Sequence, residues 1–251
     1  MAGLADAYED ALARRREEIV GRIEAAASRA GRDAADIRLI AVSKTVGADE
    51  LFAAIRVGYR TFAENRPQML NAKLAALAEH PELPEVRFDL IGNLQKNKIN
   101  AVIGRVALIH SISSLHLAEA VSSRVLRRQE DDPAALSGPQ DVLLEVNVSG
   151  EETKSGFSPE EVRAALEDLA GLPGIRIRGL MTMAPQGERD RARRTFEDLR
   201  ALRDELAHRA PELDLTELSC GMSEDFEEAV AAGSTIVRLG RVVFDPSFAL
   251  R

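Results

Sequence analysis

One lysine stands where an apolar strand is expected to end. Lys44 follows the run of residues 39–43 and is one of only five lysines among the 33 basic residues. Desolvation and a neighbouring cation both favour the uncharged form of a lysine amine. An uncharged amine can attack an aldehyde and form a Schiff base. The alternative is a lysine whose ammonium simply reaches water, and Lys44 taken alone favours that alternative.

A second candidate is an anion site near the C-terminus. Residues 219–223 link a predicted strand to a predicted helix, and backbone N–H groups of such a turn can hold a phosphate. Gly240 follows the last predicted strand, and phosphate sites built after strands seven and eight recur in (β/α)8 barrels. The structural alternative makes Ser223 only a helix cap and Gly221 only a turn residue. Two acidic residues in the first helical turn favour that alternative somewhat.

Arg238 is the third candidate, because alternation along the last predicted strand could point it into the barrel. An inward arginine needs an acceptor, which could be a pyridine nitrogen, a phosphate or a structural carboxylate. Glu64 and Glu145 are the only carboxylates at predicted strand ends that could serve as an acid/base pair. Cys220 has no obvious base beside it and is expected to be a small buried residue.

Composition excludes several classes of protein. The 251 residues carry a formal net charge of −8, which argues against a general nucleic-acid binder. No apolar run reaches the roughly 18–20 residues that span a bilayer, and the N-terminus is too charged for a signal peptide. The single cysteine excludes a disulfide framework and fits a reducing cytoplasm. The four histidines do not cluster at the spacing of metal ligands, so no metal site is expected.

Short β-branched runs alternate with longer amphipathic stretches. A helix covers the first thirty residues, with Leu4, Tyr8, Leu12, Ile19 and Ile23 at helical spacing. The predicted strands are 37–43, 59–63, 88–91, 107–110, 141–147, 175–180, 214–218 and 235–239. The stretches predicted to be helical between them are 48–57, 67–78, 115–128, a helix capped by Ser158, 189–208 and 223–232. A short polar-apolar stretch lies near 98–104, and 129–140 reads as a loop.

Several of the predicted strands are apolar almost throughout, as expected for strands covered on both faces of a parallel sheet. Eight such repeats predict a closed (β/α)8 TIM barrel with an extra N-terminal helix, in one domain over residues 1–251. The alternative is an open doubly wound sheet, which is less favoured because no Gly-rich dinucleotide turn follows the first strand. Since about ten residues follow the last strand, we expect no second β-domain.

The order of short segments along the chain resembles the pyridoxal phosphate homeostasis protein family. The segments include Leu39-Ile-Ala-Val-Ser-Lys-Thr, Phe62-Ala-Glu-Asn-Arg-Pro-Gln, Leu90-Ile-Gly-Asn-Leu-Gln-Lys-Asn-Lys, Glu145-Val-Asn-Val-Ser, Leu218-Ser-Cys-Gly-Met-Ser-Glu-Asp and Ala232-Gly-Ser-Thr-Ile-Val-Arg-Leu-Gly. None is decisive alone, but together they span residues 39 to 245 in order.

The resemblance implies a fold-type III protein that binds pyridoxal 5′-phosphate (PLP). It matches Lys44 to the lysine that holds PLP as a Schiff base and Asn65 to a residue lining the cofactor ring. It matches Ser223, with the backbone of Gly240 and Arg241, to the phosphate-holding set. In the wider fold type, Arg238 matches the arginine that faces the pyridine nitrogen. No catalytic residue is implied.

The chain departs from that family at three positions. Asp89 stands where a histidine is common, Cys220 where a methionine is usual and Asp245 where a glycine is usual. None of the three belongs to the implied Schiff-base or phosphate contacts. Asp245 leaves the closing turn of the barrel open, because a residue with a side chain resists positive φ.

Three functions remain to be weighed. The leading one is a cytoplasmic, monomeric PLP-binding protein of vitamin B6 homeostasis, not a conventional enzyme, with PLP-dependent apo-enzymes as its expected recipients. The second is an alanine-racemase-like or decarboxylase-like enzyme, and the third is a phosphometabolite enzyme on the same fold. Whether Lys96, Lys98 or Lys154 offers a second contact to PLP stays open.

Overall fold

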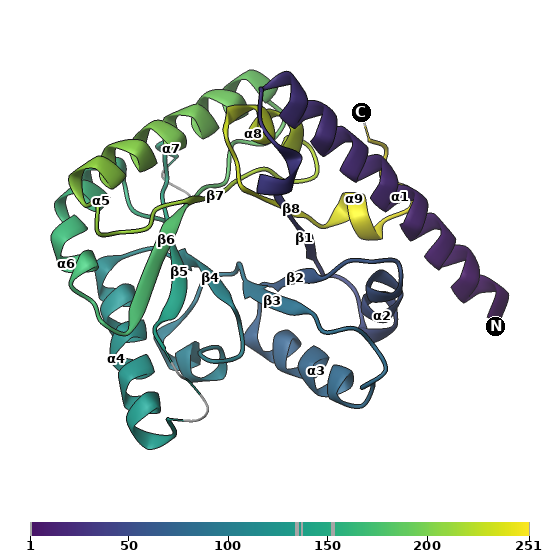
Figure 1. Cartoon of the computed structure of the whole chain (residues 1–251), viewed down its shortest axis with the longest axis horizontal. Coiled ribbons are helices and arrows are strands. Elements are labelled where there is room, and N and C mark those ends of the chain that lie inside the picture. Colours follow the sequence, from purple (N-terminus) through teal and green to yellow (C-terminus); the bar gives the residue numbers. More distant parts are fainter. Residues whose placement is uncertain (1, 134–135, 137, 152–153, 251) are drawn as a thin grey trace.

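Eight parallel strands close into a barrel in the order in which they occur along the chain (Figure 1). This computed structural model describes residues 2–133, 136, 138–151 and 154–250. The strands are β1 (Arg38–Val42), β2 (Thr61–Glu64), β3 (Arg87–Leu90), β4 (Leu108–Ile112), β5 (Gln140–Glu145), β6 (Ile175–Met181), β7 (Glu217–Ser219) and β8 (Ile236–Leu239). The predicted (β/α)8 barrel is confirmed, and each predicted run contains a strand. Because β8 pairs with β1, all eight carboxyl ends meet at one mouth.

Helices surround the barrel on its outer face (Figure 1). They are α1 (Ala2–Arg29), α2 (Ala48–Arg56), α3 (Pro67–Ala78), α4 (Leu115–Asp131), α5 (Pro159–Ala164), α6 (Leu166–Ala170), α7 (Arg189–Arg209), α8 (Phe226–Ala232) and α9 (Arg241–Phe244), with the 3-10 helices η1 (Ala34–Asp36) and η2 (Lys96–Ala101). None of the described helices combines the length and the apolar character needed to cross a membrane.

Four expected elements differ from the structure. The Ser158 capping box is present, but the helix divides at Ala165, whose ψ of 1° departs from helical geometry. Residues 98–104 contribute only to the 3-10 helix η2, and the expected loop 129–140 begins later because α4 extends to Asp131. Parts of that loop lie outside the described residues. Helix α8 begins at Phe226 because residues 222–225 first close a hydrogen-bonded turn.

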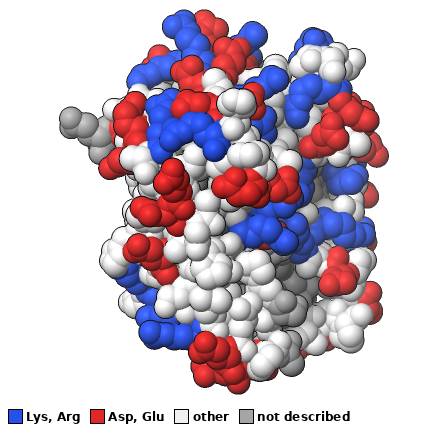
Figure 2. Space-filling view, turned by 60° about the vertical axis from the view of Figure 1, so that its left-hand side comes forward, with Lys and Arg blue, Asp and Glu red and all other residues white. Residues whose placement is uncertain are grey.

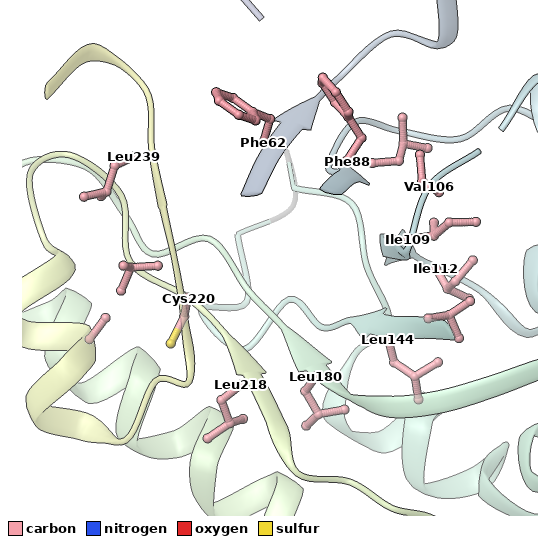
Figure 3. Close-up of a cluster of buried hydrophobic side chains, with 14 of the residues drawn as sticks. Phe62, Phe88, Val106, Ile109, Ile112, Leu144, Leu180, Leu218, Cys220 and Leu239 are labelled. Atoms are coloured by element: carbon pink, nitrogen blue, oxygen red, sulfur yellow. The ribbon is translucent and has the colours of Figure 1, made fainter. Parts of the chain in front are cut away.

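Two separate apolar clusters follow from the alternation of side chains along each strand. The larger one lies between the sheet and its helices, and Figure 3 shows part of it, with Phe62, Leu218 and Cys220. Burial in this cluster raises the pKa of the Cys220 thiol to about 11, so Cys220 packs as a small apolar residue. The smaller cluster fills the barrel interior and comprises Ile40, Val42, Ala63, Leu108, Leu143, Met181 and Ile236.

The N-terminal helix packs on the outside of the barrel. Helix α1 contacts α2, α8 and α9 and lies along the side of the molecule that these three helices form (Figure 1). Leu12, Ile19 and Ile23 on its apolar face are buried. The side chain of Leu4 lies outside what the structure describes. The extra N-terminal helix predicted from periodicity is therefore present, and it packs against other helices on the outside of the barrel.

This packing predicts that Ile19→Ala destabilises the whole fold. Ile19 is fully buried, so its truncation leaves a cavity and costs about 2–5 kcal/mol of unfolding free energy. The control is Glu17→Ala on the exposed face of the same helix, which we expect to change stability by less than about 0.5 kcal/mol. Urea unfolding measures both. Equal stability of the two variants would show that α1 is not packed as described.

Candidate functional site

A cavity of about 1000 Å³ lies at the mouth of the barrel. The structure brings all six residues of the predicted cofactor site to its wall. These are Lys44, Asn65, Ser223, Arg238, Gly240 and Arg241. They come from β8 and from the segments that follow β1, β2, β7 and β8, which closure of the barrel places side by side.

Lys44 lies in the turn after β1, two residues beyond its last strand residue. Its side chain is exposed and lines the cavity. Within the described part of the chain, Lys44 makes no hydrogen bond or ion pair. The amine is therefore accessible to a ligand in the cavity.

A second lysine lies behind this turn with the opposite surroundings. Lys73 of α3 is buried, and its Nζ is 2.5 Å from Glu64 Oε1 and donates to the Ser43 carbonyl oxygen at 2.5 Å. The Ser43 hydroxyl also donates to Glu64 Oε1, at 2.7 Å. Because Ser43 precedes Lys44, this buried pair fixes the backbone from which Lys44 projects. Lys73 was not predicted to have a role here, because its position nine residues after Glu64 in the sequence does not indicate that the two side chains meet.

Asn65 is positioned by close contact between two chain segments. A Cβ atom on Gly92 would lie only 2.0 Å from the Asn65 carbonyl oxygen, so this approach requires glycine. The Ile91 N–H donates to the Glu64 carbonyl at 2.9 Å and continues the pairing of β2 with β3. The two contacts hold Asn65 at the cavity wall.

Ser223 does not cap α8, whose N-cap is Asp225, but its hydroxyl oxygen accepts a hydrogen bond in the first turn of α9. Helix α8 begins three residues later, and the Val242 N–H donates to Ser223 Oγ at 3.2 Å. The Ser223 hydroxyl proton has no acceptor among the described residues, and a ligand in the cavity can accept it. Gly221 has φ +92°, and a Cβ there would lie 2.6 Å from Ala229 Cβ. The turn that carries Ser223 therefore depends on this glycine.

The closing turn after β8 needs no positive φ. Asp245 has φ −101°, so its side chain causes no backbone strain, and the question that its presence raised is settled. Arg241 lines the cavity, but its guanidinium lies 2.5 Å from Glu224 Oε1 and over the Phe248 ring at 5.3 Å. Only the backbone of Arg241 is left to hold a phosphate, as the resemblance implies.

Arg238 is a buried cation without a carboxylate partner. It is 5% exposed, and its Nη1 and Nη2 donate to Ser219 Oγ at 2.6 Å and to the Thr182 carbonyl at 3.0 Å. Among the described residues it makes no ion pair. Burial lowers the pKa of Arg238, which shows how little water solvates the guanidinium. No described carboxylate forms the ion pair considered for Arg238, and its side chain lines the cavity.

The two carboxylates considered for acid/base chemistry are not equivalent. Glu145 lines the cavity, and burial raises its pKa even though its Oε1 accepts a hydrogen bond from Ser155. Glu64 is held by Lys73 and is not among the residues that line the cavity. The phosphometabolite alternative therefore loses one member of its acid/base pair.

The three other lysines are not among the residues that line this cavity. Lys96 and Lys98 belong to η2, and neither lines the cavity. Lys154 donates to the Met183 carbonyl at 3.1 Å and is paired with Glu151. A second PLP contact through any of them stays untested.

Charges of both signs are interspersed over the face shown in Figure 2. No group of three or more histidine, cysteine or acidic side chains suited to a metal ion occurs in the described ranges. The binding chemistry that the structure offers is thus concentrated at the barrel mouth, where an amine, a hydroxyl and a guanidinium converge.

Comparison with known proteins places this barrel in a class. Residues 17–247 match the family model of the alanine racemase N-terminal domain. An alanine racemase of Clostridium difficile shares the fold at a TM-score of 0.66, with 15% identity over 95% of this chain and 59% of that chain.

The relatives narrow this class further. The pyridoxal phosphate homeostasis protein of Aquifex aeolicus is 38% identical over 92% of this chain and 96% of its own length, and the human one is 37% identical over 89% and 82%. The structure of PipY from Synechococcus elongatus with PLP bound has a TM-score of 0.78, with 32% identity over 93% of this chain and 99% of that chain. The chain belongs to the pyridoxal phosphate homeostasis protein family.

The buried pair behind Lys44 predicts a large cost for Lys73→Met. This variant leaves the Glu64 carboxylate buried without its cation, which costs about 3–5 kcal/mol of unfolding free energy. The double variant Lys73→Met with Glu64→Met should recover most of that loss, because an apolar pair leaves no buried charge. Urea unfolding compares the variants, and a double variant as unstable as the single one would contradict this account.

Proposed function

We propose that this chain binds PLP in the cavity at the barrel mouth and holds it as a Schiff base on Lys44, as part of vitamin B6 homeostasis. One observation carries the proposal: an amine and a guanidinium that form no ion pair with any described residue line the same cavity. PLP supplies the aldehyde and acceptors that these groups lack.

The cavity fits this cofactor. Its volume of about 1000 Å³ is at the upper end of small-molecule pockets, so a phosphorylated pyridine can enter it. The unused hydroxyl proton of Ser223 suits a phosphate oxygen. Arg238 suits an unprotonated ring nitrogen, since a guanidinium only donates hydrogen bonds.

Each residue of the chain has a distinct part in this binding. The Lys44 amine would hold PLP through its aldehyde as a Schiff base. Ser223 and the backbone of Gly240 and Arg241 would bind the phosphate. Asn65 would line the ring, and Arg238 would face the ring nitrogen. The Glu64–Lys73 pair keeps the turn that carries Lys44 in place.

We propose that the protein holds and passes on PLP and does not turn over a substrate. Support comes from its relatives, which are named homeostasis proteins and not enzymes. PLP-dependent apo-enzymes are the proposed recipients. We also propose that the protein is a monomer with one domain over residues 1–251 and that it acts in the cytoplasm. The unpaired, buried thiol of Cys220 supports a reducing compartment.

Lys44→Ala should abolish covalent capture of PLP. After incubation with PLP and borohydride, the wild-type protein should gain the mass of one reduced cofactor, and the variant should not. The variant should stay folded, because the Lys44 side chain is exposed. Lys96→Ala is the control, since Lys96 is exposed outside the cavity. Cofactor mass on the Lys44→Ala variant would refute the assignment.

Ser223→Ala combined with Gly240→Ala should weaken the binding of PLP but not of pyridoxal, which lacks the phosphate. The first change removes a donor, and a Cβ on Gly240 would lie 3.3 Å from the Val42 carbonyl oxygen and displace the turn. Loss of one or two hydrogen bonds to a charged group predicts an affinity loss of about 10- to 100-fold for PLP. Equilibrium titration with both ligands tests this, and equal losses would place the phosphate elsewhere.

A further inference from the structure

A polar layer crosses the barrel interior beneath the cavity. It consists of Asp89 on β3, His110 on β4, Ser219 on β7 and Arg238 on β8. Asp89, His110 and Ser219 are almost completely buried. Interiors of (β/α)8 barrels are dominated by branched apolar side chains, so four adjoining polar residues need an explanation.

Hydrogen bonds join these residues into one chain. Ser219 Oγ lies 2.6 Å from Arg238 Nη1 and 2.8 Å from His110 Nδ1. His110 Nε2 lies 3.2 Å from Asp89 Oδ2. The Arg87 Nε–H donates to Asp89 Oδ1 at 3.0 Å and closes the far end. The chain therefore connects the cavity wall with the opposite end of the barrel.

With a neutral imidazole facing the Asp89 carboxylate, one placement of protons satisfies every bond in this hydrogen-bonded chain. Arg238 can only donate, so Ser219 Oγ accepts from it and gives its own single proton to His110 Nδ1. His110 then carries its proton on Nε2 and donates it to Asp89. Burial lowers the pKa of His110, and the Arg238 charge adds to that effect against the opposing influence of Asp89.

We propose that Asp89 and His110, acting through Ser219, are positioning residues that aim the Arg238 guanidinium at the ring nitrogen of bound PLP. This inference rests on the proposed function. Ser219 and the Thr182 carbonyl fix two of the guanidinium nitrogens. Both acceptors are neutral, so they orient the cation without cancelling its charge.

Asp89→Asn keeps the size and shape of the side chain but reverses the direction of the hydrogen bond between residue 89 and His110. The Arg87 Nε–H keeps the amide oxygen on its side, so the amide N–H faces His110 Nε2. His110 must then carry its proton on Nδ1, so Ser219 Oγ accepts from both His110 and Arg238, and its own proton loses its acceptor. Ser219→Ala removes the link altogether. Both variants should loosen Arg238.

The test compares PLP with an analogue that has a C–H group in place of the ring nitrogen. The wild-type protein should bind PLP more tightly than the analogue, because the analogue cannot accept the Arg238 hydrogen bond. In Asp89→Asn and in Ser219→Ala this preference should fall by about 10-fold, the effect of one hydrogen bond to a charged group. Leu143→Met, a volume-conserving change in the same interior, is the control and should keep the preference.

The outcomes separate this inference from the proposed function. Equal loss of affinity for both ligands would mean that the polar layer is only structural, and an unchanged preference would mean that it does not act on Arg238. Equal binding of both ligands by the wild-type protein would place Arg238 away from the ring nitrogen. Each of these results overturns the inference while PLP binding stands. If the wild-type protein binds neither ligand, the proposed function itself fails. Should Asp89→Asn not fold, Ser219→Ala carries the test.

Discussion

A guanidinium buried at the barrel mouth without an ion-pair partner among the described residues is the constraint on which the site depends. Removing a charge from water costs several kcal/mol unless hydrogen bonds or an opposite charge compensate. Arg238 donates two hydrogen bonds to neutral acceptors, and the charges of Asp225 and Glu145 act on it without a direct contact. The positive charge of Arg238 is therefore not neutralised by a direct contact. A ligand in the cavity that places a hydrogen-bond acceptor near this guanidinium would gain a favourable interaction.

Two lysines near the turn after β1 have different roles because their surroundings differ. Lys73 is buried, and Glu64 and the Ser43 carbonyl use its donors. Lys44 projects into the cavity and has no partner in the described part of the chain. The first lysine fixes the backbone beside the second. An amine held in place but left unpaired is what condensation with an aldehyde needs, because no ion pair must break first.

Sequence patterns were sufficient for the barrel but only partly for the site. The alternation of apolar runs and amphipathic stretches located eight strands, and the strand ends brought Lys44 and Arg238 forward as candidates. The resemblance to the family added Asn65, Ser223 and the backbone of Gly240 to the candidate site. Contacts across the interior were not predictable, because they depend on barrel closure and on the register of each strand pair. Asp89, noted only as a departure from the family, thus gained a partner in His110 once β3 and β4 were placed.

The proposed position of Arg238 also bears on why holding PLP need not lead to turnover. PLP enzymes use the ring as an electron sink, and a protonated ring nitrogen strengthens that sink. A guanidinium facing the nitrogen donates a hydrogen bond and keeps its proton, because arginine side chains stay charged in proteins. The ring would then be a weak sink. The neutral His110 behind Ser219 cannot deliver a proton to the nitrogen either, because Arg238 stands between them. The same polar layer that orients the cofactor would therefore also keep its ring unprotonated, which suits storage of a reactive aldehyde better than carbanion chemistry.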